Sequence, residues 1–360
     1  MENNKKKIVI AAGGTGGHIF PSISLADYLL KDYKVIVTTD TRGFKYIKNY
    51  KNAEIQIINS KPILSKNIFK VFLGFFTIIF SLFYSLIFLI KQKPKLVIGM
   101  GGYSSFSICF AAFILSIPII LYENNLVIGK VNKFLLPFAK KIAVSTEDIK
   151  GVKNKNKLIH SGYLLRKEIF NITDNDSGFE KKDLSILIIG GSQSAKIFSD
   201  SLPSILEKCY KNGIRFRIFQ QCLKEQENKI EEVYKKLNFN FKLFSFSENP
   251  FEYYKNIDIA ISRSGASSIA ELINLRIPFI TVPLPSSADN HQFENAHYFE
   301  KKGYCFLIEE KFIHNKLFEL LKELNQNRNK LLLFKKNMGK HSDKDSLFKI
   351  KKIIEKVLNV

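Results

Sequence analysis

Three segments of this 360-residue chain place glycines and small hydroxyl residues directly after an apolar run. The first reads GGTGGHIFP at Gly13–Pro21, and the others read GGSQSA at Gly190–Ala195 and RSGASSIAE at Arg263–Glu271. Glycine lets backbone N–H groups approach a ligand closely, and the start of a helix carries positive potential. One such segment alone would be an ordinary turn between a strand and a helix. Three of them favour a phosphate-bearing ligand that several helix starts contact.

Two acidic residues stand where a ribose could be bound. Asp40 follows the second candidate strand, and Glu271 lies about one turn into the helix after RSGAS. The first glycine turn together with Asp40 is compatible with a nicotinamide-dependent oxidoreductase. That turn departs from the dinucleotide fingerprint, however, because Ile19 stands where the third glycine belongs. An oxidoreductase also leaves the second and third glycine segments and Glu271 unexplained.

The elements around these segments follow a repeated pattern, in which short apolar runs alternate with longer helical stretches. This pattern is typical of βα units and parallel sheets. Candidate strands in the first half are Ile8–Ala12, Lys34–Thr38, Glu54–Ile58, Leu96–Ile98, Pro118–Leu121 and Lys141–Val144. Candidate strands in the second half are Leu184–Ile189, Phe216–Gln220, Phe241–Phe246, Asp258–Ile261, Pro278–Val282 and Tyr304–Leu307. We therefore predict an α/β fold with two Rossmann-like domains.

A polar stretch at about Asn171–Lys182 separates the two halves of the chain. We place the first domain at residues 1–165 and the second at residues 166–340. The last helix, about Asp345–Leu358, follows a polar break, and we expect residues 341–360 to rejoin the first domain. The glycine segments of both domains would then meet one ligand in the cleft between them.

One segment of the first domain is unusually apolar. Val71–Ile90 carries no charge, with Lys70 before it and Lys91 after it, and its 20 residues are long enough to span a bilayer as a helix. Candidate strands of one sheet lie on both sides of it, and a single span would separate them. We therefore expect one or two helices that turn one face inward and another toward lipid. A fully buried core helix and a true span are the alternatives.

The composition is that of a folded protein with an excess of positive charge. Hydrophobic residues make up 46% of the chain, and 55 Lys+Arg against 33 Asp+Glu give a net charge of +22. This charge favours nucleic acid or an anionic membrane surface as a partner, although AT-rich codon usage would produce the same excess. No motif interleaves aromatic and basic residues, so we expect no nucleic acid. The four cysteines lack C-x-x-C spacing, which argues against a zinc site or a disulfide framework.

Further motifs complete a recognisable series. In chain order it comprises GGTGGHIFP, GMGGYSS at Gly99–Ser105, YENN at Tyr122–Asn125, GGSQ, RSGAS with Glu271, and DNHQFENA at Asp289–Ala296. Together these motifs resemble the MurG family of bacterial glycosyltransferases, from Ile8 to about Phe306. The resemblance implies a GT-B fold, in which two Rossmann-like domains face each other across a cleft. It also implies peptidoglycan synthesis, by inverting transfer of GlcNAc from UDP-GlcNAc to the 4-hydroxyl of a lipid-linked muramyl-pentapeptide acceptor. The expected place is the cytoplasmic side of the cell inner membrane, as a peripheral protein.

The resemblance also assigns substrate contacts to individual residues. In chain order they are Thr15, Gly16, Gly17, Asn125, Arg166, Ser192, Ser247, Ala266, Ser267, Ser268, Ile269, Ala270, Glu271 and Gln292. Within this set, Glu271 would bind the ribose, backbone groups at Ser247 the uracil edge, and Gln292 the GlcNAc hydroxyls. Asn125 would bind the sugar, and Arg166 would lie near the phosphates, a task that suits a bidentate guanidinium.

The expected chemistry separates charge without a metal. Negative charge grows on UDP as the sugar–phosphate bond breaks, and helix starts together with Arg166 would stabilise it. The acceptor hydroxyl must lose a proton, and His18 is the preferred general base because imidazole titrates near neutral pH. Glu123 is the second candidate, and the alternative role of His18 is to cap its helix or orient the backbone. Asp174–Asp176 has the Asp-x-Asp spacing of metal-dependent transferases, but no strand leads into it, so we expect a linker, no metal and no cofactor.

The sequence departs from the family pattern at several positions near the expected site. Tyr122 and Asn124 replace the His and Gln of the family's HEQN, Ser194 replaces a glycine, and Tyr163-Leu164 replace Asn-Pro. These departures concern the acceptor side more than the donor side. Another GT-B enzyme with a different UDP-sugar and a glycolipid acceptor, or a membrane-bound scaffold without turnover, therefore stays an alternative. Transfer of labelled GlcNAc would distinguish them.

Overall fold

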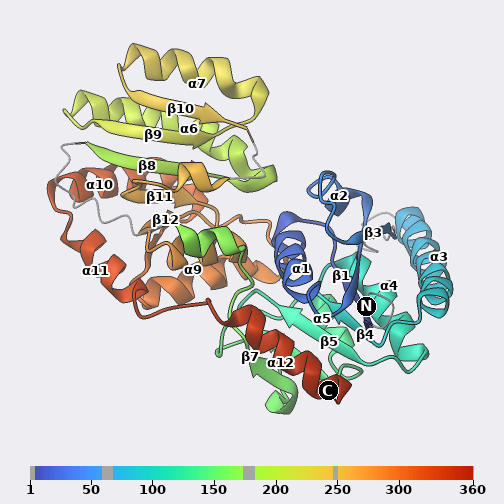
Figure 1. The fold of residues 1–360 in the computed structure, drawn as a ribbon. Helices are drawn as coiled ribbons and strands as arrows, with labels where there is room; N and C mark the ends of the chain where they lie inside the picture. Colours follow the sequence, from blue (N-terminus) through green and yellow to red (C-terminus); the bar gives the residue numbers. More distant parts are fainter. Residues whose placement is uncertain (1–4, 59–67, 173–182, 246–249, 360) are drawn as a thin grey trace. The chain divides into compact units, whose positions relative to one another are not determined.

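The computed structural model describes residues 5–58, 68–172, 183–245 and 250–359, which form two units. The first unit comprises Met1–Arg166 and Asp343–Val360, and the second comprises Lys167–Ser342. Each unit has its own parallel sheet with helices on its faces (Figure 1). The prediction of an α/β fold with two Rossmann-like domains is confirmed.

The sheet of the first unit has the strand order β3-β2-β1-β4-β5-β6-β7, and neighbouring strands are parallel. The strands are β1 (Lys7–Ala11), β2 (Lys34–Thr39), β3 (Glu54–Ile57), β4 (Leu96–Gly99), β5 (Ile119–Glu123), β6 (Lys141–Val144) and β7 (Leu158–His160). The central strands are continuous apolar runs because helices bury both of their faces. Strand β7 was not expected from the sequence, since its three residues, LIH, carry no periodicity.

The sheet of the second unit has the order β10-β9-β8-β11-β12-β13 and is also parallel. Its strands are β8 (Leu184–Ile189), β9 (Phe216–Gln221), β10 (Asn240–Phe244), β11 (Ile259–Ser262), β12 (Phe279–Thr281) and β13 (Cys305–Leu307). Both sheets therefore reverse their strand order beside the first strand, as in nucleotide-binding Rossmann folds.

Helices connect the strands and cover the sheets. In the first unit they are α1 (Gly16–Leu29), α2 (Thr41–Phe44), α3 (Ile68–Gln92), α4 (Tyr103–Ile114), α5 (Lys130–Leu135) and the 3₁₀ turn η2 (Lys155–Lys157). In the second unit they are α6 (Gly191–Lys211), α7 (Lys224–Lys236), α8 (Ala266–Asn274), α9 (His291–Lys301), α10 (Ile313–Gln326) and α11 (Asn329–Met338). The 3₁₀ turns of this unit are η3 (Lys167–Asn171), η4 (Pro250–Tyr253), η5 (Ala288–Asn290) and η6 (Glu310–Phe312).

The C-terminal helix α12 (Ser346–Leu358) belongs to the first unit. Figure 1 shows it, in red, among the blue to green elements of that unit. Its residues Ile350 and Ile354 are completely buried in the same core as the apolar side chains of α1. Just before α12 begins, the carboxylate of Asp343 accepts a hydrogen bond from the backbone N–H of Tyr163 at 2.9 Å. This contact fixes the chain at one of the positions where the sequence departs from the family.

Helix α3 contains the apolar segment as one continuous helix. Its described side chains divide into two faces: Ser85 and Leu89 are buried, whereas Phe80 and Phe83 are 71% and 63% exposed. The alternative of a fully buried core helix is therefore wrong. Among the described residues, no helix combines the length and apolarity needed to cross a membrane.

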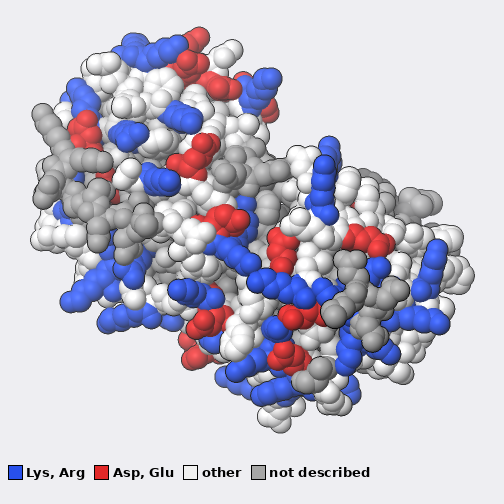
Figure 2. Space-filling view, in the orientation of Figure 1, with Lys and Arg blue, Asp and Glu red and all other residues white. Residues whose placement is uncertain are grey.

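Charged side chains are spread over the molecule. On the face in Figure 2, Lys and Arg are scattered over both units, with Asp and Glu interspersed. The basic residues on this face therefore do not form a single stripe.

Candidate active site

The glycine-rich segments occupy equivalent places in the two sheets. GGTGG follows β1 and GGYSS follows β4, whereas GGSQ follows β8 and RSGAS follows β11. These are the strand pairs beside which each sheet reverses its order. Parallel α/β sheets bind ligands beyond the carboxyl ends of such strands, because the helices that follow diverge to opposite faces. The topology thus brings four motifs together as two pairs, one in each unit.

The two glycine loops of the first unit pack directly against each other. A Cβ atom at Gly13 would overlap the hydroxyl of Ser104, and one at Gly102 would lie 2.7 Å from the carbonyl oxygen of Gly13. Gly14 and Gly102 also have positive φ angles, of 85° and 81°. Glycine is needed at these positions because the opposite loop occupies the space of a side chain and because the backbone is left-handed.

His18 lies in the first turn of α1 and is half-buried. Its Nδ1 is 3.0 Å from the carbonyl oxygen of Gly13. A carbonyl oxygen only accepts, so this contact places a proton on Nδ1 and makes Nε2 the basic nitrogen. Nε2 lies 3.1 Å from the position that a Cβ atom at Gly101 would take. The ring is therefore oriented by one glycine loop and directs its basic nitrogen toward the other.

Glu123 is the last residue of β5 and is 3% exposed. Its Oε1 accepts from the backbone N–H and the Nδ2 of Asn125, at 3.0 and 3.1 Å. Its Oε2 accepts from the backbone N–H of Gly129 and the Nδ2 of Asn132, both at 2.9 Å. The loop that carries Asn125 is thus folded around this carboxylate. Four donors suit a group that positions Asn125 better than one that accepts a proton from a substrate.

The two departures within YENN contribute to the same framework. Asn124 donates from Nδ2 to the carbonyl oxygen of Gly17 at 2.7 Å, which joins the end of β5 to the first turn of α1. The hydroxyl of Tyr122 accepts from the backbone N–H of Leu164 at 3.1 Å. Burial raises the pKa of Tyr122 well above its usual value, so this hydroxyl stays neutral. Both replacements are therefore accommodated by hydrogen bonds inside the first unit.

Asp40 supports the glycine turn from α2, of which it is the N-cap. Its Oδ1 accepts from the backbone N–H groups of Gly43 and Gly14, at 2.8 and 3.3 Å. Its Oδ2 pairs with the guanidinium of Arg42 at 2.6 Å. A ribose-binding acid must offer its oxygens to a ligand. The buried carboxylate of Asp40 instead accepts hydrogen bonds from groups within the protein. The main support for a dinucleotide site is therefore lost.

Phe20 connects Arg166 to the first glycine turn, because its ring lies close to both. The guanidinium of Arg166 is 5.1 Å from the centre of the Phe20 ring, a cation–π contact. The same ring lies 2.9 Å from the position that a Cβ atom at Gly16 would take. The structure thus places Arg166 beside the start of α1, near Thr15, Gly16 and Gly17.

In the second unit, α6 begins at Gly191, directly after β8. The backbone N–H of Gly190 donates to Oε1 of Gln221 at 3.2 Å, which ties the turn to the end of β9. Ser192 lies in the first turn of α6, where positive helix potential favours an anion. The side chains of Ser192 and Ser194, and the whole of Ser247, lie outside the described part of the chain.

Helix α8 begins at Ala266 with Gly265 as its N-cap, and its first turn holds no acidic residue. The positive potential at its start is therefore not opposed by a carboxylate of its own. The predicted phosphate contacts, Ala266, Ser267, Ser268, Ile269 and Ala270, form the first turn and a half of this helix.

A buried arginine supports the turn before α8. Arg263 donates from Nη1 to the carbonyl oxygens of Val282 and Pro283, both at 3.1 Å. Its Nη2 pairs with the carboxylate of Glu310 at 2.5 Å. This guanidinium joins β11 to the end of β12 and to η6, so its role lies in the framework of the second unit.

Two of the predicted ligand-binding side chains are each held at one end. The Oε1 of Gln292 accepts from the backbone N–H of Leu284 at 3.0 Å. The Oε2 of Glu271 accepts from the hydroxyl of Tyr254 at 2.6 Å. Each contact restricts the rotamer before any ligand arrives.

The described site residues thus gather at the carboxyl edges of the two sheets. The first unit holds Thr15, Gly16, Gly17, His18, Glu123, Asn125 and Arg166, and the second holds Ser192, Ala266 to Glu271 and Gln292.

Sequence reasoning missed Tyr254 and Asn132, whose partners lie 17 and 9 residues away. The tyrosine pair Tyr253-Tyr254, a few residues before β11, is the one local signal that could have drawn attention to Tyr254. Within the described ranges, no cluster of three or more His, Cys, Asp or Glu could hold a metal ion, and Asp174–Asp176 lies outside them.

Comparison with known proteins covers both units. The glycosyltransferase family 28 N-terminal domain matches residues 8–144, and the family 28 C-terminal domain matches residues 185–357. The UDP-N-acetylglucosamine--N-acetylmuramyl-(pentapeptide) pyrophosphoryl-undecaprenol N-acetylglucosamine transferase of Pelagibacter ubique is 37% identical, over 92% of this chain and 93% of its own. The protein of the same name from Rickettsia canadensis is 41% identical over 83% of this chain and 85% of its own. This chain belongs to the MurG family of glycosyltransferases.

Solved structures agree on the fold of this MurG-family chain. The crystal structure of MurG from Acinetobacter baumannii has a TM-score of 0.77 at 24% identity, over 98% of this chain and 99% of that one. The glycosyltransferase of kitacinnamycin has a TM-score of 0.72 at 14% identity, over 98% of this chain and 99% of that one. The predicted GT-B class and the family resemblance inferred from the motifs are both confirmed.

Proposed function

We propose that this protein transfers N-acetylglucosamine from UDP-GlcNAc to undecaprenyl-pyrophosphoryl-MurNAc-pentapeptide. The product is the lipid-linked disaccharide of peptidoglycan synthesis, and the 4-hydroxyl of the muramyl sugar is the acceptor. The observation that carries the proposal is 37% identity to a transferase named for this reaction, over 92% of the chain. The site geometry supports it, because both units present glycine-lined helix starts at their carboxyl edges.

The second unit supplies most contacts to the donor in this proposal. The start of α8, Ala266 to Ala270, and Ser192 on α6 bind the diphosphate through N–H groups and positive helix potential. Glu271 accepts from the ribose, backbone groups at Ser247 read the uracil, and Gln292 binds GlcNAc hydroxyls. From the first unit, Arg166, Asn125 and the turn Thr15 to Gly17 complete the contacts to the phosphates and sugar.

Charge development defines the roles of these groups. The bond from the anomeric carbon to the phosphate oxygen breaks, its electron pair stays on UDP, and positive charge grows on the anomeric carbon. Fixed N–H groups and Arg166 stabilise the negative charge on the departing UDP. Electrostatic catalysis is strongest at the atoms where charge develops in the transition state. The acceptor oxygen attacks the face opposite UDP, so the configuration inverts.

Nε2 of His18 takes the proton of the acceptor hydroxyl during this attack. The bond from Nδ1 to Gly13 holds the ring and stabilises the imidazolium that forms. Glu123, the second candidate for the base, instead positions Asn125 through two hydrogen bonds and is itself held by two more, from Gly129 and Asn132.

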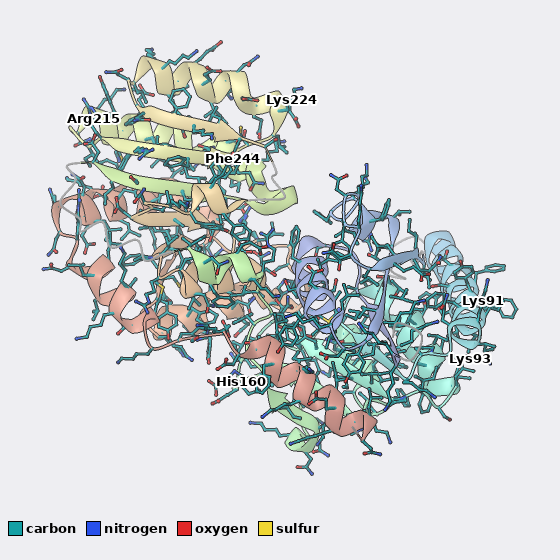
Figure 3. All side chains as sticks on the ribbon, in the orientation of Figure 1. Lys91, Lys93, His160, Arg215, Lys224 and Phe244 are labelled. Carbon is teal, nitrogen blue, oxygen red and sulfur yellow. The ribbon has the colours of Figure 1, made fainter. Side chains whose placement is uncertain are left out.

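The first unit also carries a surface suited to a membrane. Six exposed apolar side chains follow one face of α3, namely Ile79, Phe80, Phe83, Tyr84, Ile87 and Ile90. Lys91 and Lys93 stand exposed at the end of this helix (Figure 3). Apolar burial combined with attraction to anionic lipid gives peripheral attachment. We infer binding to the cytoplasmic side of the cell inner membrane, where a lipid-linked acceptor would be presented.

The decisive experiment incubates the purified protein with radiolabelled UDP-GlcNAc and the lipid-linked muramyl-pentapeptide. The expected product is the labelled disaccharide on the lipid. Transfer only from another UDP-sugar, or only to a different glycolipid, would contradict the proposal and favour another GT-B enzyme. Thermal stabilisation by NAD and not by UDP would favour the oxidoreductase.

A further inference from the structure

A tyrosine from a neighbouring segment fixes the carboxylate of Glu271. Tyr254 lies between η4 and β11, whereas Glu271 lies on α8, beyond β11. The tyrosine hydroxyl donates to Oε2 of Glu271 at 2.6 Å. That length is typical of a charge-assisted bond between a hydroxyl and an ionised carboxylate. A carboxylate has about four acceptor positions, and the bond from Tyr254 occupies one of them.

Tyr254 is itself held by its surroundings. It is 2% exposed, and its ring centre lies 6.5 Å from that of Phe251. Its backbone N–H donates to the carbonyl oxygen of Phe251 at 3.3 Å. A few residues later, the carboxylate of Asp258 accepts from the backbone N–H of Ser185 at 2.8 Å, which anchors the start of β11 to β8. The hydroxyl that contacts Glu271 therefore comes from a fixed framework.

We propose that Tyr254 is a positioning residue for recognition of the donor's ribose, an inference that rests on the proposed role of Glu271. The glutamate side chain has three rotatable bonds, and ordering it only when the nucleotide arrives would cost conformational entropy. The Tyr254 hydroxyl orders it beforehand, with the carboxylate in the orientation that accepts from ribose hydroxyls. Ribose recognition in this chain thus depends on the pair of Tyr254 and Glu271 and not on the glutamate alone.

A purely structural contact between these segments would have different consequences. Its loss would loosen the second unit and weaken the binding of every nucleotide alike. Loss of positioning weakens only nucleotides whose ribose carries hydroxyl groups. UDP and 2′,3′-dideoxy-UDP share the uracil and the diphosphate and differ only in these hydroxyls, so the two nucleotides separate the two roles.

The experiment measures the binding of UDP and 2′,3′-dideoxy-UDP to the full chain by titration calorimetry. The proteins are the wild type, Tyr254→Phe, Glu271→Ala and the double variant. Tyr254→Phe removes one hydroxyl and keeps the buried ring. We expect it to weaken UDP binding about tenfold or more, as for hydrogen bonds to charged groups, and to change dideoxy-UDP binding less than about twofold. In the Glu271→Ala background the same change should have no further effect.

Tyr253→Phe is the matched control. The Tyr253 hydroxyl is bonded to Glu252 instead of Glu271, and its ring stacks on Phe244 at a centroid distance of 3.9 Å. Figure 3 labels Phe244 at the end of β10. This control loses a hydroxyl from the same segment and keeps the stacking, so it should bind UDP as the wild type does. In turnover assays, Tyr254→Phe should raise the KM for UDP-GlcNAc and leave kcat within about twofold.

The outcomes distinguish this proposal from the function on which it rests. Wild-type binding of UDP with an unchanged Tyr254→Phe variant overturns the positioning role and leaves the proposed function standing. An equal loss for both nucleotides also overturns it, since that result identifies a structural contact. A wild-type protein that does not bind UDP overturns the proposed function, and the positioning role with it.

Discussion

Most charged side chains around the glycine loops are engaged inside the protein. Asp40 supports a turn together with Arg42, Glu123 accepts from four donors, and Arg263 joins three segments of the second unit. Burying such groups is costly, and their partners compensate for the lost hydration. The hydrogen bond of His18 has another result, because it orients the ring and makes Nε2 the basic nitrogen.

His18→Ala should therefore lower kcat by about 10²-fold or more, since general-base catalysis contributes on that order. UDP binding should be unchanged, because the imidazole contacts the acceptor in our proposal. Turnover and calorimetric titration measure the two effects. His160→Ala is a suitable control, since His160 contacts Glu147 and the carbonyl oxygen of Ser145 away from the glycine loops. A near-wild-type rate for His18→Ala would leave the imidazole with a structural role only.

Glu123 is the second candidate for the general base. The Glu123→Gln variant distinguishes a role in positioning Asn125 from a role in base catalysis. An amide offers only one acceptor oxygen, so two of the four buried donors would face an NH₂ group. We expect the free energy of unfolding to fall by about 1–3 kcal/mol, measured by urea denaturation. The exposed Glu147→Gln should change it little. A Glu123→Gln variant of full stability that has lost turnover would identify a base instead.

At the scale of elements, the two loops of the first unit form one structure. Gly13 lies against Ser104 at the start of α4, and the Gly13 carbonyl oxygen contacts His18 on α1. The position of the imidazole therefore depends on how closely α4 approaches the turn after β1. Small residues at this contact are needed because each Cβ atom would push the loops apart.

Gly13→Ala should lower both stability and turnover. Overpacking of this kind costs about 1–3 kcal/mol, and the displaced carbonyl would also release His18. Ser104→Gly removes the opposing atoms at a cost of about 1 kcal/mol in helix propensity. The double variant should be more stable and more active than the sum of the single effects predicts. Strict additivity in thermal unfolding and turnover would show that the two loops do not interlock in solution.

At the scale of the whole molecule, charge and apolar surface are arranged differently. Basic residues are scattered over both units on the face in Figure 2, whereas exposed aromatic and aliphatic residues gather on α3 of the first unit. The apolar face of α3, which lies beside exposed lysines, favours attachment through that unit. Electrostatic attraction to anionic lipid alone would not favour the first unit, because basic residues are scattered over both units on the face in Figure 2.

Phe80→Glu with Phe83→Glu should release the protein from vesicles that contain phosphatidylglycerol. Burying one phenylalanine contributes about 1.5–3 kcal/mol, so losing two should weaken binding more than tenfold in a sedimentation assay. Leu332→Glu with Leu333→Glu on α11 is the control, because these leucines are also exposed but lie in the second unit. Equal loss in both pairs, or none in the first, would contradict attachment through α3.

The sequence alone determined every described strand except β7, the two-domain organisation and the place of the motifs. Continuous runs of Val, Ile and Leu predict buried parallel strands because the pattern is local, and glycine segments after such runs mark carboxyl edges. The three-residue strand β7 was missed since so short a run carries no periodicity.

The tertiary structure decided which acidic side chains are enclosed by partners within the protein. Asp40 and Glu271 are equally plausible ribose acids by sequence position, yet one is enclosed by Arg42 and two backbone donors and the other is held by Tyr254. It also decided which side chains of the C-terminal helix enter the core of the first unit, among them Ile350 and Ile354. These outcomes depend on contacts between residues distant along the chain, and such contacts leave no periodic signal in the sequence.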